Sequence, residues 1–175
     1  MKRILLAALI VSLPLIAQKP RVKRAALEAV EKGFDQRITT ISDDPFLLLG
    51  PTRGIYLEGY GAVFTAEINL VSGPTLNPFQ QTIPPAQVEQ VRTKKLERLP
   101  ILRERMRDLL LSSASHLGDV PPQEQLVLGV RLLYRSYENT GGMPSQIIMQ
   151  GERASLIKAH AKTVPAESVI KVQEF

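Results

Sequence analysis

The side chains best suited to acid–base or metal chemistry in this sequence are two histidines, His116 and His160. A zinc site needs three or four ligands at workable spacing, and the sequence holds no H-x-x-x-H or H-E-x-x-H pattern. His116 precedes Asp119 by three residues and has serines close by, but the members of a Ser-His-Asp triad usually come from distant segments. No G-x-S-x-G pattern is present either. We therefore expect His116 to be a cation at a helix end, and we predict no catalytic residue, metal site or cofactor.

Acidic and basic residues in two alternating segments form a second candidate. Glu67 and Asn69 share the more polar face of one expected strand, and Arg131 and Arg135 lie likewise on another. If the two strands are neighbours, opposed pairs are solvent-facing ion pairs worth about 0.2–1 kcal/mol. The alternative is a polar site on an open sheet face, where arginines hold a carboxylate or phosphate. Glu67 and Arg131 are candidate binding residues on the second interpretation.

The stretch YLEGYGAVFTAEINLV, residues 56–71, places two glycines inside an expected strand. A regular strand of this length would span about 50 Å, so we expect Gly59 and Gly61 to bend it and to separate GIYLE from AVFTAEINLV. The alternative is that the bend aims aromatic side chains into a cleft. Tyr56 and Tyr60 would line that cleft with Glu58 between them, which makes these three further candidate binding residues.

The strongest helical pattern follows a proline-rich segment. Apolar residues recur mostly at three- and four-residue steps over residues 85–117, and Lys95 belongs to a basic series on the opposite side, which acidic residues interrupt. Pro100 removes one backbone donor inside this helix. We expect one helix kinked at Pro100 rather than two helices, because the apolar stripe continues through it. The basic side is expected to be solvated and stabilised by pairs three residues apart.

The remaining elements complete an α+β pattern. We expect an N-terminal helix at 22–37, strands within 47–71, a hairpin at 124–150 with a Gly141-Gly142 turn, and a short helix at 152–162. ESVIKVQEF at the C-terminus is either a last strand or a frayed tail. The sequence thus predicts a single α+β domain over residues 18–175. Its small, mainly antiparallel sheet of about four strands would pack against the long kinked helix.

Residues 1–17, MKRILLAALIVSLPLIA, have the layout of a signal peptide: a charged start, a short apolar run and a small residue before Gln18. The apolar run is shorter than the roughly 20 residues of a membrane span. We expect cleavage and a periplasmic or extracellular protein with no integral membrane domain; the alternative is an uncleaved N-terminal anchor. The absence of cysteine excludes disulfides, thiolate metal sites and lipid attachment at a cysteine.

The charge balance does not favour nucleic acid as a partner. The 175 residues include 22 Lys and Arg against 17 Asp and Glu, for a net charge of +5. Lys2 and Arg3 belong to the expected leader, so the mature chain is only mildly basic. We expect a solvated basic face rather than a nucleic-acid interface.

These observations favour an exported binding or structural domain that is not an enzyme, with another protein or an envelope polymer as its partner. One alternative is a cofactor-free hydrolase that uses Ser/His/Asp or Glu chemistry. Another is a carrier that holds an apolar small molecule beneath Leu99 and Pro100. The sequence does not indicate an oligomeric state.

Overall fold

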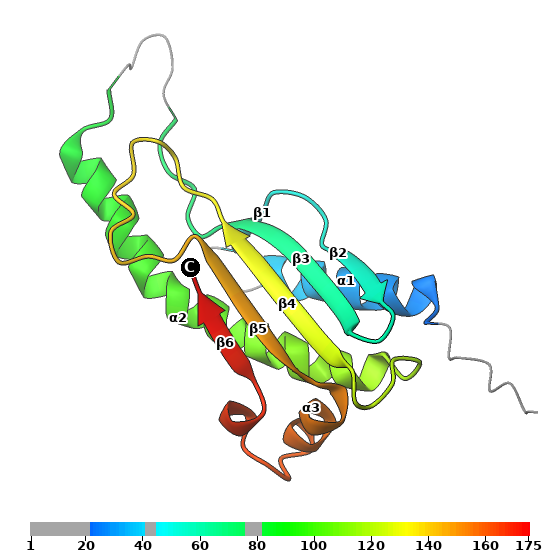
Figure 1. Ribbon diagram of the computed structural model, residues 1–175. Coiled ribbons are helices and arrows are strands. Elements are labelled where there is room, and N and C mark those ends of the chain that lie inside the picture. The colour runs from blue at the N-terminus through cyan, green and yellow to red at the C-terminus, as the bar shows by residue number, and fades with distance from the viewer. Residues whose placement is uncertain (1–21, 41–44, 76–81) are drawn as a thin grey trace, which may run out of the picture.

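A computed structural model describes residues 22–40, 45–75 and 82–175, which form a single α+β domain (Figure 1). The expected signal peptide, residues 1–17, lies outside the described residues. The helices are α1 (Arg24–Thr39), α2 (Pro85–His116) and α3 (Arg153–His160), followed by one short 3-10 turn at Ala166–Ser168. The strands are β1 (Leu47–Leu48), β2 (Arg53–Leu57), β3 (Gly61–Asn69), β4 (Gln125–Leu132), β5 (Gln146–Glu152) and β6 (Lys171–Glu174). The fold class predicted from the sequence is confirmed.

The sheet has six strands, two more than expected, in the order β1-β3-β4-β5-β6. β1 and β2 lie end to end along the outer edge of β3, because β1 pairs with its last residues and β2 with its first. The sheet is mainly antiparallel, as expected, and the one parallel pair is β3 with β4. That pair is parallel because α2 carries the chain back to the starting end of β3 before β4 begins. The C-terminal segment, for which the sequence allowed either a strand or a frayed tail, forms strand β6, which pairs with β5.

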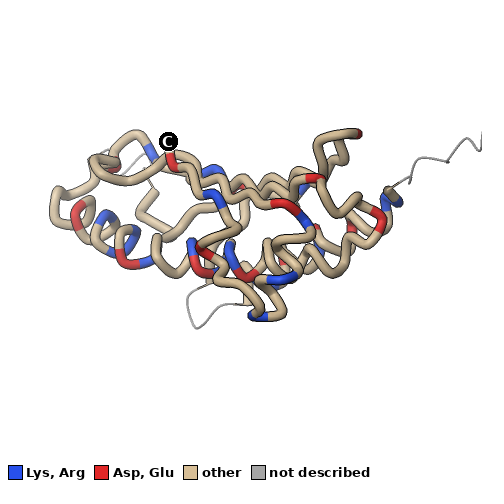
Figure 2. The backbone as a smooth tube through the Cα atoms, turned by 60° about the horizontal axis from the view of Figure 1, so that its bottom comes forward, with Lys and Arg blue, Asp and Glu red and all other residues tan. Residues whose placement is uncertain are grey.

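All three described α-helices lie on one face of the sheet, so the domain has two layers (Figure 2). α1 packs on β1 and β2, α2 on β4 and β5, and α3 on α2 and β5. Alternate strand residues such as Phe64, Ile68 and Leu128 point into this layer and meet Leu102 and Met106 of α2. Each of these side chains is buried. The core therefore lies between the helices and one face of the sheet.

Helix α2 runs without interruption from Pro85 to His116, close to the expected range. Pro85 occupies the first turn, where its missing N–H costs no hydrogen bond. Pro100 lies in the interior, and its neighbours Leu99 and Leu102 are buried against the core. Burial on both sides of Pro100 explains why the helix remains one element despite the lost hydrogen bond.

The two glycines expected to bend one long strand instead reverse the chain. Glu58, Gly59 and Tyr60 form the turn of a hairpin between β2 and β3, and the N–H of Tyr60 donates to the Leu57 carbonyl at 3.0 Å. Gly59 has a φ of +79°, which suits glycine at a tight turn. The expectation of a single bent strand was wrong, because sequence alternation does not distinguish a bend from a reversal with three residues in the turn.

Candidate binding surface on the open face of the sheet

The face of the sheet opposite the helices presents a mixed apolar and polar surface. The strand registers place Ile55, Val63 and Val127 in one row across β2, β3 and β4. The next row contains Arg53, Thr65, Gly129 and Ile148, and the one after it contains Glu67, Arg131 and Gln146. Because alternate residues of a strand share a face, all of these positions face away from the helices. We call this surface the open face.

A concavity of about 450 Å³ lies on the open face. We call it the hollow; its lining includes Leu49, Gly50, Pro51, Arg53, Thr65, Glu67, Gly129, Arg131 and Gln146. The segment that joins β1 to β2 forms one wall, since Leu49, Gly50 and Pro51 line the concavity between the two strands. Gly129 lies on the central strand β4, where a side chain would otherwise fill the space. A Cβ added there would meet nothing closer than the Phe64 carbonyl oxygen at 3.9 Å.

Glu67 and Arg131 form the ion pair that the sequence suggested. They are register partners on β3 and β4, and Arg131 Nη1 lies 2.8 Å from Glu67 Oε1. Both side chains remain more than half exposed, at 53% for Glu67 and 73% for Arg131. Arg135 does not join them, because β4 ends at Leu132 and Arg135 lies in the following loop. The pair lines the hollow, so the two sequence interpretations of these residues are compatible.

Arg53 on β2 is the charged residue of the hollow that the sequence patterns did not single out. It lies in register with Thr65 and is exposed. Within the part of the chain that the structure describes, no hydrogen bond or ion pair involves its guanidinium. Alternation in RGIYL could have predicted which face of the strand Arg53 occupies. Only the fold shows that β1 and β2 pair with the same edge of β3.

Tyr56, Glu58 and Tyr60 lie away from the hollow. Tyr56 pairs with Ala62 and therefore projects to the helix side, where its hydroxyl donates to Glu124 Oε1 at 3.2 Å. Partial burial and this bond raise the pKa of Tyr56. Glu58 and Tyr60 are exposed on the hairpin turn. The structure thus separates the five sequence candidates into a pair in the hollow and three residues at the hairpin.

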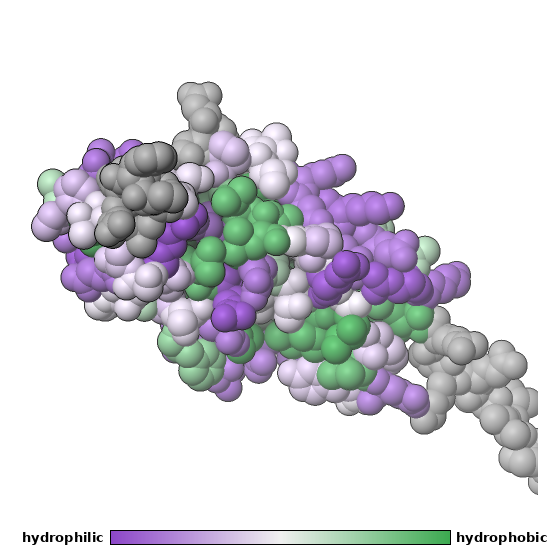
Figure 3. Space-filling model, turned by 90° about the horizontal axis from the view of Figure 1, so that it is seen from above, coloured by the Kyte–Doolittle hydropathy of each residue, from purple (hydrophilic) through white to green (hydrophobic). Residues whose placement is uncertain are grey.

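Apolar side chains continue along the open face beside the hollow. Leu47, Leu49, Ile55 and Leu57 are each 41–55% exposed on the β1–β2 edge. Figure 3, which views the molecule from this edge, shows apolar surface in separate patches with hydrophilic surface between them. This combination of exposed aliphatic side chains with a few polar groups is typical of binding sites.

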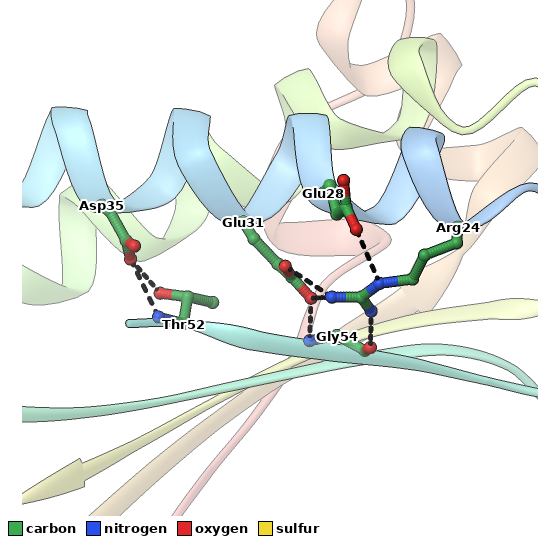
Figure 4. A network of polar contacts seen from close by, with 6 residues as sticks. All are labelled: Arg24, Glu28, Glu31, Asp35, Thr52 and Gly54. Atoms are coloured by element: carbon green, nitrogen blue, oxygen red, sulfur yellow. Dashed lines mark hydrogen bonds and ion pairs between the residues drawn. The ribbon is translucent and has the colours of Figure 1, made fainter. Parts of the chain in front are cut away.

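The outer edge of β2 is closed by side chains of α1 (Figure 4). Glu31 Oε1 accepts the Gly54 N–H at 2.6 Å, and Arg24 donates to the Gly54 carbonyl at 2.8 Å. Asp35 accepts the Thr52 N–H at 3.0 Å. These backbone groups would otherwise offer a pairing template to another strand. A partner of this edge must therefore use the open face rather than extend the sheet at Gly54.

Lys95 contradicts the expected solvated basic side of α2. Its side chain is fully buried, and Nζ lies 2.5 Å from Glu138 Oε2 and 3.0 Å from the Leu133 carbonyl oxygen. Nζ also lies 4.7 Å from the centre of the Tyr134 ring. The partners all come from the loop 133–145 between β4 and β5, so this cluster attaches the loop to α2. The periodicity of the helix alone could not reveal a loop that covers its basic side.

The two histidines occupy the helix ends where the sequence placed them. His116 is the last residue of α2, and its Nδ1 lies 2.9 Å from the Ser112 carbonyl oxygen. The hydroxyls of Ser112 and Ser113 both donate to the Leu109 carbonyl. His160 ends α3 and is exposed. Among the described residues, no group of three or more His, Asp or Glu side chains is arranged to hold a metal ion.

The interior offers little room for an apolar ligand at the pocket between α1, α2 and the sheet. This pocket has a volume of about 10 Å³ and is lined by Phe34, Phe64 and Leu110 rather than by Leu99. A volume of that size barely accommodates one water molecule.

Comparisons with known proteins do not indicate a function. The chain matches no protein-family model, no curated protein and no solved structure. Among the described helices, none is long and apolar enough to span a membrane.

Proposed function

We propose that this protein is an exported, non-enzymatic binding module that holds another protein or an envelope polymer against its open face. The observation that carries the proposal is the hollow, which combines charged and apolar walls around the unsubstituted centre of the sheet at Gly129. Its volume of about 450 Å³ falls in the usual range of ligand sites. The proposed compartment rests on the signal-like residues 1–17, and the proposed class of partner rests on the modest net charge.

A solvated sheet face is the simplest alternative, since antiparallel sheets often expose one face to water. Two features favour binding instead. The exposed residues include aliphatic side chains such as Ile55, which is 55% exposed, rather than the regular polar series of a solvated face. The central pair β3–β4 is parallel, and parallel strands are usually covered on both faces.

Site-specific photocrosslinking in the cells that produce the protein tests the proposal. A benzophenone amino acid at Gln146, in the hollow, should yield a discrete adduct, whereas the same probe at Lys158 on α3 should not. Gly129→Leu should abolish the Gln146 adduct because it fills the hollow. Gly118→Leu is the matched control, since a Cβ there meets nothing within 4 Å and Gly118 lies outside the sheet.

Equal adducts from Gln146 and Lys158, or a Gln146 adduct that survives Gly129→Leu, would contradict binding in the hollow. Absence of any adduct from Gln146 would also reject it. Circular dichroism and thermal unfolding of both leucine variants would establish that they are folded.

A further inference from the structure

The charges around the hollow do not balance. Arg53 and Arg131 contribute two positive charges and Glu67 one negative charge, and Arg131 is already paired with Glu67. Arg53 has no such counterpart within the described part of the chain. The hollow therefore presents one uncompensated guanidinium, whose planar donors match a carboxylate in geometry.

This balance favours a carboxylate over a phosphate. A carboxylate carries one negative charge and would neutralise the hollow. A phosphate monoester carries about −1.5 to −2 at neutral pH, so it would leave excess negative charge beside Glu67. Charge repulsion at contact distance opposes that arrangement.

The surroundings of Arg53 indicate an apolar context for the carboxylate. Leu49 and Pro51 form a wall of the hollow, and Ile55 follows Arg53 by two residues on the same face. A chain in extended conformation repeats its side chains every two residues on one face. Apolar residues two positions before and after an acidic residue would therefore meet these aliphatic side chains. Because Glu31 and Arg24 occupy the backbone groups of Gly54, such a chain would dock through its side chains.

We propose that the hollow recognises an acidic side chain in an extended apolar segment of a partner protein, with Arg53 binding its carboxylate. This inference rests on the proposed function and specifies the partner and the chemistry of the same site.

Three blocked peptides of one design test the inference: Ac-Ser-Leu-Ser-X-Ser-Leu-Ser-NH₂, in which X is Glu, Gln or phosphoserine. Each is titrated into ¹⁵N-labelled protein, and NMR follows the Gly129 amide and the Arg53 Nε–H. The Glu peptide should shift both signals and bind about three- to fivefold more tightly than either relative, which is the upper part of the range for one exposed charge pair. Arg53→Gln should remove that preference and leave the affinity for the Gln peptide unchanged. Arg135→Gln, which alters an exposed arginine outside the hollow, should preserve the preference.

The inference is overturned if the Glu and Gln peptides bind equally, if the phosphoserine peptide binds best, or if none shifts the two signals at its solubility limit. Failure of the proposed function is distinguishable by crosslinking. If the Glu and Gln peptides bind equally while Gln146 still gives its adduct in the unmodified sequence, the open face still binds and only carboxylate recognition is rejected. If Gln146 gives no adduct in the unmodified sequence, the proposed function itself is rejected.

Discussion

Two glycines on neighbouring strands, Gly61 and Gly129, are present for different reasons. Gly61 has a φ of +137°, and a Cβ there would lie 1.8 Å from the Gln125 carbonyl oxygen. The start of β4 thus approaches β3 too closely for any side chain. Gly129 has open space around its Cα on the open face. The first glycine is required by the backbone, and the second leaves the hollow unfilled.

Alanine at these two positions should therefore have opposite effects. Gly61→Ala should lower the free energy of unfolding by more than the roughly 1 kcal/mol range of strand propensity, because backbone has to move. Gly129→Ala should be neutral or stabilise by up to about 1 kcal/mol through the unfolded state. Urea denaturation of both variants measures the difference. A loss below about 0.5 kcal/mol at Gly61 would show that the close approach to Gln125 is not maintained.

Tyr134 should titrate abnormally. Burial, followed by the nearby Glu138 carboxylate, raises its pKa from 10.0 to about 12. Because the folded pKa exceeds the unfolded one, the stability from neutral Tyr134 is fully present below pH 10.0 and is lost as pH rises toward about 12. Absorbance at 295 nm should show a late tyrosine ionisation that is missing from Tyr134→Phe. A titration curve unchanged by that substitution would contradict the burial of this ring.

At the scale of elements, the loop 133–145 depends on buried and polar contacts with its neighbours. Lys95 and Glu138 bind it to α2, and Arg92 donates to the Gly141 carbonyl at 2.8 Å. The Tyr137 hydroxyl donates to the Pro74 carbonyl at 2.6 Å, which joins the loop to the segment after β3. A loop of this length without helix or strand is uncommon in a compact domain. These contacts explain how it is held in one conformation.

Breaking the buried pair should be far more damaging than breaking the exposed one. Glu138→Gln leaves the Lys95 charge buried without its partner and should reduce the free energy of unfolding by about 3–5 kcal/mol. The matched control is Arg131→Gln, which removes an exposed pair and should cost less than about 1 kcal/mol. Urea denaturation gives both values, and hydrogen exchange should show faster exchange across residues 133–145 in the first variant only.

Similar losses in the two variants would mean that Lys95 and Glu138 do not form a buried pair. A second substitution distinguishes lost charge from lost packing. Lys95→Met combined with Glu138→Leu should recover much of the stability, because no uncompensated charge remains.

At the scale of the whole molecule, the two-layer arrangement places the buried core and the open face on opposite sides of the sheet. Core residues such as Leu102 and Met149 are buried between the helices and one face of the sheet. The opposite face contributes its side chains to the hollow instead. Substitutions at the rim of the hollow should therefore have little effect on folding, so a change in the proposed binding can be measured on folded variants.

The predicted signal peptide determines the residue at which the mature protein should begin. Native mass spectrometry of the protein exported by its own leader should give a mass that begins at Gln18, since Ala17 is the expected last leader residue. A mass that retains Met1 would make the protein N-terminally anchored and contradict the predicted cleavage. Additional mass that disappears on denaturation would identify a bound ligand and favour the carrier alternative.

Local patterns predicted most helices and strands but not which of them lie side by side in the fold. The three- and four-residue steps of Leu96, Leu99, Leu102 and Met106 identified α2, because a buried helical stripe has that period. Alternation identified β3 and β4, because alternate residues of a strand lie on the same face of the sheet. The hairpin at Gly59 was mistaken for a bend, since both demand glycine at the same place.

The sequence by itself determined the fold class, the exclusion of disulfides and the helix-end positions of the histidines, because each depends on residue type or on contacts close along the chain. The tertiary structure alone decided that β4 lies beside β3, which brings Glu67 to Arg131 from distant segments. It also decided the burial of Lys95 and the opening of the hollow beside Arg53. Those features depend on which elements become neighbours and which face the helices cover, and no local period encodes either.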